Sequence, residues 1–121
     1  MDLAKYHYLY NAAAYFATME KYPDGFFEVM TKNDRTGLEA MCWMLQLMSE
    51  QGELMRRYMG YDKEETFNAD EAILKLRPKD IALARSVIMT AMDVGLNTEG
   101  DDEEEVDLVL VELEKKIKPH D

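Results

Sequence analysis

The feature that most constrains the fold is a stretch from Thr36 to Met59 in which apolar residues recur at helical spacing. Thr36 and Glu39 have the spacing of a capping box, and Gly60 follows the last periodic residue. A helix of this length spans roughly 36 Å, about the diameter of a small domain. The sequence therefore predicts an all-α fold, a small single-domain helical bundle with one long central helix at about residues 36–59.

The apolar part of this predicted helix is wider than a surface helix normally shows. Its polar stripe comprises Glu39, Gln46, Glu50, Glu53 and Arg57. One apolar flank comprises Leu38, Met41, Met44, Leu45, Met48, Met55 and Met59, and the other comprises Trp43, Leu47, Leu54 and Tyr58. Two interpretations follow: neighbouring helices surround this helix, or part of it contacts another chain. If part of the helix contacts another chain, the candidate protein-interaction surface comprises Trp43, Leu47, Leu54 and Tyr58.

Shorter helices are predicted on both sides of the long one. Asn11 is placed to cap a helix over residues 12–21. Asp24 is placed to cap a short helix over residues 26–30. Asn68 precedes a short helix that ends near residue 76. Pro78 suits the first turn of a further helix, which we expect to end at Val94 because Gly95 follows. The ten methionines are expected mainly to fill an irregular core.

The C-terminal region is distinguished by its charge. Of 25 acidic and 14 basic residues, nine acids and no base lie between Glu99 and Glu114. We divide the chain into a helical core domain, residues 1–98, and an acidic C-terminal helix or tail, residues 99–121, packed on or extending from it. Residues 106–111 are rich in strand formers, so a strand remains an alternative there, although the apolar spacing over 106–117 favours a helix starting near Asp101.

Composition excludes several classes of function. A net charge of −11 argues against binding to nucleic acid or to an anionic membrane surface. Apolar runs stay well below the roughly 18 residues of a membrane span, and the first residues do not resemble a secretory signal. The single cysteine, Cys42, fits a reducing compartment. We expect a cytoplasmic protein.

The sequence carries few residues suited to catalysis. Its two histidines, His7 and His120, lie near opposite ends of the chain, and Cys42 falls in the middle of the long helix, where a buried, inert thiol is expected. The motifs HExxH, CxxC, GxxxxGK and GxGxxG do not occur. The acidic run 101–105 does not have the ligand pattern of an EF-hand. We predict no catalytic, cofactor-binding or metal-binding residues, hence no enzyme and no cofactor.

Two stretches carry a resemblance to a known family. One runs from Gly37 to Met48 and continues over 53–60, and the other runs from Leu76 to Ile81 and leads into 88–95. Together with residues 10–14 and the Phe26-Phe27 pair, their order resembles the tail assembly chaperones of long-tailed, siphovirus-like phages and prophages. The likeness covers about residues 6–96, and its motifs are apolar and diffuse.

The resemblance implies a small helical protein that acts in virion assembly and is absent from the mature virion. Such proteins are thought to coat the tape-measure protein, keep it soluble and recruit tail-tube subunits, and some self-associate. Many are also made as a longer, frameshifted product. The partners implied are therefore the tape-measure and tail-tube proteins and further copies of this chain, in the cytoplasm of the host cell.

Two other classes of function stay open. One is an acidic regulatory adaptor or inhibitor, antitoxin-like or a nucleic-acid mimic, that binds a basic partner protein through salt-sensitive contacts. The other is an enzyme with an unrecognised helical site, which tight binding of a metal or small cofactor would indicate.

Overall fold

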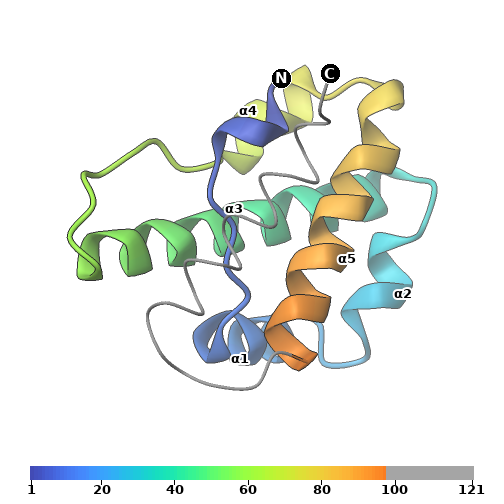
Figure 1. Cartoon of the computed structure of the whole chain (residues 1–121). Coiled ribbons are helices and arrows are strands. Elements are labelled where there is room, and N and C mark those ends of the chain that lie inside the picture. The colour runs from blue at the N-terminus through green and yellow to red at the C-terminus, as the bar shows by residue number, and fades with distance from the viewer. Residues whose placement is uncertain (98–121) are drawn as a thin grey trace.

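The computed structural model describes residues 1–97, which form a small helical bundle without strands. Its elements are the 3₁₀ helix η1 (Leu3–Lys5), α1 (Ala12–Lys21), α2 (Phe26–Met30), α3 (Arg35–Tyr58), α4 (Ala69–Lys75), the 3₁₀ helix η2 (Pro78–Asp80) and α5 (Ile81–Asn97). The long helix α3 crosses the molecule, with α1 and α2 on one side and α4 on the other (Figure 1), and it contacts α1, α2, α4 and α5. The all-α fold with one long central helix is confirmed. The predictions for 99–121 lie outside the described residues.

The long helix begins earlier than its capping pattern predicted. The carboxylate of Asp34 accepts a hydrogen bond from the backbone N–H of Gly37 at 3.0 Å, so α3 starts at Arg35 and the prediction of Thr36 as its cap was wrong. A carboxylate at this position satisfies a free N–H and also interacts favourably with the helix dipole. At the other end Gly60 takes a φ of 96°, which lets the chain turn away after Tyr58.

The shorter helices follow their predicted caps in two of three cases. Asn11 accepts from the N–H of Ala14 at the start of α1, and Asn68 accepts from that of Glu71 at the start of α4. The prediction for Asp24 was wrong: the cap of α2 is Gly25, which has a φ of 121° and makes no side-chain capping bond. The glycine conformation, rather than a side chain, sets the direction in which α2 begins.

An extended N-terminal segment, residues 6–10, passes between α3 and α5. Its backbone approaches both helices at glycines, because a Cβ atom at Gly52 would meet the carbonyl oxygen of His7 and one at Gly95 would meet that of Tyr10. The N–H of Leu9 also donates to the carbonyl oxygen of Met48 at 3.0 Å. Gly95 is therefore a packing residue and not a helix end, and α5 continues to Asn97, beyond the predicted end at Val94.

The core lies along α3 and is rich in methionine, as predicted. Met41, Met44, Leu45 and Met48 are at most 1% exposed, and α5 contributes Ala84, Val87, Ile88 and Ala91. Tyr8 and Phe67 are also almost fully buried, and the ring of Phe67 lies edge-on against that of Tyr6 at 5.4 Å. Within residues 1–97, no helix combines the length and the apolar character needed to cross a membrane.

Candidate functional site: a charged cluster and the apolar end of α3

The connection between α3 and α4 is held on α3 by three side chains, which we call the polar ladder. Each accepts a hydrogen bond from a backbone N–H of the connection or of the first residue of α4. The pairs are Ala69 N with Gln46 Oε1 at 2.8 Å, Phe67 N with Ser49 Oγ at 2.6 Å, and Glu64 N with Glu53 Oε1 at 2.8 Å. The acceptors are three and four residues apart, so they share one stripe of the helix. The ladder satisfies backbone groups that neither a helix nor a sheet would pair.

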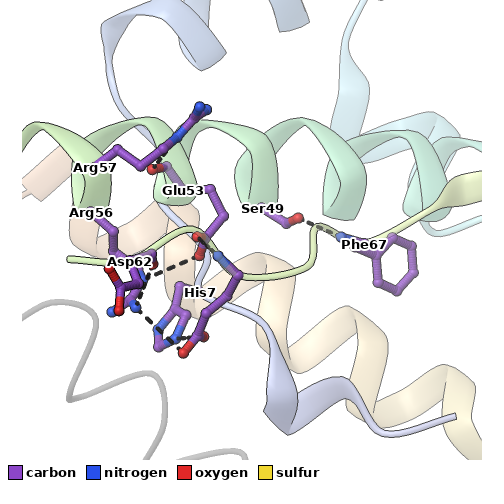
Figure 2. A network of polar contacts seen from close by, with 8 residues as sticks. His7, Ser49, Glu53, Arg56, Arg57, Asp62 and Phe67 are labelled. Carbon is purple, nitrogen blue, oxygen red and sulfur yellow. Dashed lines mark hydrogen bonds and ion pairs between the residues drawn. The ribbon is translucent and has the colours of Figure 1, made fainter.

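One end of the ladder is a charged cluster formed by His7, Glu53 and Arg56 (Figure 2) together with Glu64. The side chain of Glu53 is 2% exposed, and its Oε2 lies 3.3 Å from Nε of Arg56, in an orientation that favours an ion pair over an aligned hydrogen bond. Glu64 lies 3.4 Å from Nη2 of Arg56 through Oε1 and 2.9 Å from Nε2 of His7 through Oε2. Arg56 thus lies between two carboxylates and offsets the cost of burying one of them.

Arg56 also connects the cluster to the turn that follows α3. Its Nη2 donates to the carbonyl oxygen of Asp62 at 3.4 Å, and its guanidinium carbon lies 4.9 Å from the centre of the Tyr61 ring. On the other side of α3 in Figure 2, Nε of Arg57 donates to the carbonyl oxygen of Glu53 at 3.5 Å. These contacts orient the turn on the same side of α3 as the polar ladder.

Three members of the cluster are also potential metal ligands. His7, Glu53 and Glu64 each offer one ligand atom, and these atoms lie within 4.8 Å of one another. One imidazole and two carboxylates are a donor set that divalent cations such as Zn²⁺ use. The guanidinium of Arg56 already contacts both carboxylates, so a metal ion would have to share them with a fixed positive charge. We interpret the cluster as a structural element that anchors the 60–68 connection.

The lone cysteine lies in the core, as expected. Cys42 is fully buried in α3, and burial raises the pKa of its thiol from 9.0 to about 11. At neutral pH the thiolate, which is the nucleophilic form, is therefore strongly disfavoured. The predicted buried and unreactive character of this thiol is consistent with its surroundings.

The four residues predicted as an interaction surface divide into two groups. Trp43 and Leu47 are half-buried against the core, and the Trp43 ring lies edge-on against Tyr22 at 5.4 Å. Leu54 and Tyr58 are 52% and 74% exposed. We call this pair the apolar end of α3. The two residues are about one turn apart on the helix, and at about 100° per residue their side chains face away from the polar ladder.

Other helices also expose apolar side chains. On α1, Phe16 and Met19 are 62% and 52% exposed, on α2 Phe27 is 53% exposed, and on α4 Leu74 is 86% exposed. Single exposed apolar residues are ordinary on protein surfaces. Phe16 and Met19 also share one face of α1, three residues apart, but the apolar end of α3 lies on the longest helix of the described residues.

The sequence did not predict the charged cluster, because its members are far apart along the chain. Glu53 was assigned to the polar stripe of the long helix, which implied contact with solvent, and the structure places it in the interior. Gln46 and Glu53 belong to that stripe with Ser49 beside them, and the spacing of this row does not separate the buried Glu53 from the exposed Glu50. No spacing rule connects that row to His7 or Glu64.

Comparison with known proteins adds no relative from which a role could be inferred: no family model, no curated protein and no solved structure matches this chain.

Proposed function

We propose that the protein is a non-catalytic, protein-binding assembly chaperone that acts in the cytoplasm of a phage-infected or lysogenic cell. In this role it coats the tape-measure protein, keeps it soluble and helps to recruit tail-tube subunits. The family resemblance over residues 6–96 supports the assignment to phage tail assembly. The observation that carries the protein-binding part is the apolar end of α3, Leu54 and Tyr58, exposed on the longest helix.

The geometry suits contact with another helix. Leu54 and Tyr58 are four residues apart, the spacing at which an amphipathic helix presents anchors to a helical partner. Tyrosine is also enriched among residues that contribute most to protein–protein binding. The polar ladder and the charged cluster hold the 60–68 connection on a different face of α3, which leaves this face accessible.

Co-expression with the tape-measure protein encoded in the same genome tests the proposal. The expected result is that this chain increases the soluble fraction of the tape-measure protein. The double variant Leu54→Glu/Tyr58→Glu should reduce that gain by about tenfold, because placing charges in the centre of an apolar contact removes more than 1.4 kcal/mol of binding free energy.

The matched control is Leu83→Glu/Met89→Glu on α5, which replaces two side chains that are 40% and 42% exposed and adds the same charge. It should keep the full gain in soluble tape-measure protein. Equal losses in the two double variants, with helix content unchanged by circular dichroism, would show that general surface charge and not the apolar end of α3 is responsible. No gain with the unmodified chain would refute the chaperone function itself.

A second candidate function is the acidic adaptor or inhibitor, and the net charge of −11 favours it. The salt dependence of binding separates the two. Association with a basic partner should weaken strongly between low and high ionic strength, because the attraction is screened over about 8–10 Å at physiological salt. Association through the apolar end of α3 should change little.

A further inference from the structure

A basic hollow lies where α4 is joined to α5. It has a volume of about 660 Å³ and is lined by Met1, Leu74, Lys75, Leu76, Arg77, Lys79 and Asp80. Leu74 is 86% exposed, so the hollow presents apolar as well as charged surface to solvent. Three positive side chains within five residues are unusual in a chain with a net charge of −11.

The positive charges of the hollow are only partly compensated. Lys75 is paired with Glu71 on α4 at 2.7 Å, and this hydrogen bond holds the pKa of Glu71 below its ordinary value. The carboxylate of Asp80 accepts from the backbone N–H of Arg77 at 2.9 Å. Among residues 1–97 no acidic group forms an ion pair with the side chain of Arg77 or Lys79. The hollow therefore offers two exposed cations and an apolar wall to an acidic ligand.

The sequence beyond the described residues contains a segment with matching chemistry. Residues 105–114 carry four acids, Glu105, Asp107, Glu112 and Glu114, interleaved with apolar residues.

 Acids of this kind complement the free cations of the hollow, and Leu108 and Leu110 complement its apolar wall.

The length of the chain decides which acids can reach the hollow. The hollow lies at the start of α5 and the chain leaves the other end of this 17-residue helix at Asn97. At 1.5 Å per residue the helix is about 25 Å long. An extended chain covers at most about 3.3–3.6 Å per residue, so about eight residues are needed to return along α5. Asp101 and Asp102 are therefore too close to Asn97, and Glu105 is among the first acids that can reach.

From this charge complementarity and this reach, we propose that residues 105–114 of the same chain bind in the basic hollow beside Arg77 and Lys79. The bound segment covers Leu74 and brings negative charge to a basic part of the described surface. The inference does not depend on the proposed chaperone function, because it concerns a contact within one chain and uses a different surface from the apolar end of α3.

Carbodiimide cross-linking of the full chain tests the proposal, because it joins a carboxylate directly to a lysine amine in contact with it. The expected products join Lys75 or Lys79 to an acid of residues 105–114, in protein that migrates as a monomer. A mixture of ¹⁴N- and ¹⁵N-labelled chains identifies which products lie within one chain. The ion pair of Lys5 with Glu65, 2.9 Å apart, is the internal positive control.

The variant Arg77→Glu/Lys79→Glu leaves Lys75 as the reporter. Its cross-links to residues 105–114 should fall by about tenfold, the scale expected when two exposed attractive contacts both become repulsive. The matched control Lys32→Glu/Lys63→Glu makes the same change in charge at exposed lysines elsewhere and should leave those cross-links unchanged.

Three results would overturn the proposal. The first is the Lys5–Glu65 product without any product from Lys75 or Lys79 to residues 105–114. The second is an equal yield in both double variants. The third is cross-linking only between chains of different isotope label, which would assign the hollow to the segment of a second copy.

Discussion

The side chain of Glu53 is almost completely buried. Glu53 lies within a regular part of α3, between Gly52 and Leu54. Its two carboxylate oxygens have different partners: Oε1 accepts from the backbone of Glu64, and Oε2 faces Arg56. A buried charge without such partners would cost several kcal/mol. At the scale of single residues, this carboxylate therefore helps to hold the 60–68 connection on α3, directly through Glu64 and indirectly through Arg56.

Replacing Glu53 by glutamine tests this role. Glu53→Gln keeps the shape of the side chain but removes its charge, so Arg56 loses its closest partner. We expect the free energy of unfolding to fall by about 2–4 kcal/mol, the lower part of this range applying if Arg56 turns toward water. Urea denaturation followed by circular dichroism measures the change.

The control for this variant is Glu50→Gln, an exposed position on the same helix, which should change the stability by no more than about 0.5 kcal/mol. Equal effects of the two substitutions would contradict the role assigned to the charged cluster.

Several residues that act on their immediate neighbours were predicted correctly, with Asp24 and Thr36 as exceptions, whereas residues that act across the chain were not predicted. Asn11 and Asn68 cap their helices through an N–H three residues ahead, and Gly60 ends α3, so all three are visible in the local sequence. Asp34 and Thr36 are both good caps, and only the path of the chain before α3 selects Asp34. The burial of Glu53 depends on Glu64, eleven residues away, and no helical pattern contains that information.

At the scale of elements, the N-terminal segment 6–10 shows why two helical glycines are needed. Gly52 on α3 and Gly95 on α5 each leave room for a carbonyl oxygen of this segment. The sequence suggested that Gly95 ended a helix, because glycine commonly does so. Only the position of the segment relative to both helices reveals the packing role, and that position depends on contacts between distant parts of the chain.

The substitution Gly52→Ala should therefore destabilise the protein, against the usual trend. In a helix, alanine is favoured over glycine by up to about 1 kcal/mol. Here the new methyl group would meet the carbonyl oxygen of His7, and displacing the segment should cost about 1–3 kcal/mol net. The midpoint of thermal unfolding measures the result.

An exposed helical position provides the comparison for Gly52→Ala. Ser86→Ala on α5 should leave the midpoint unchanged or raise it slightly, because alanine has the higher helix propensity. A higher midpoint for Gly52→Ala as well would mean that the segment does not pass as closely as described.

At the scale of the whole molecule, several buried groups connect stability to alkaline pH, and Cys42 and Tyr8 are the clearest cases. Burial raises the pKa of the Cys42 thiol from 9.0 to about 11, and burial also raises the pKa of the Tyr8 hydroxyl above its ordinary value of 10.0. Both groups stay protonated in the folded protein and ionise when it unfolds. Their contribution is fully present below about pH 9 and is lost as the pH rises above 9 for Cys42 and above 10 for Tyr8.

We therefore expect the free energy of unfolding to decrease above pH 9, with each group adding a slope of up to about 1.4 kcal/mol per pH unit. Tyr8→Phe removes one ionisable group, so its slope above pH 10 should be smaller, even though loss of the hydrogen bond to the Leu3 carbonyl oxygen lowers stability at all pH values. Urea titrations between pH 7 and 11 measure both effects.

The position of the N-terminal segment also affects how the chain can fold while it is being made. Tyr10 is synthesised early, but Gly95, against which it packs, is among the last of the described residues to be added. At about 5–20 residues per second, the interval between them is roughly 4–17 s. During that interval Tyr10 lacks the part of α5 against which it packs, so this end of the N-terminal segment cannot reach its final packing until α5 has left the ribosome.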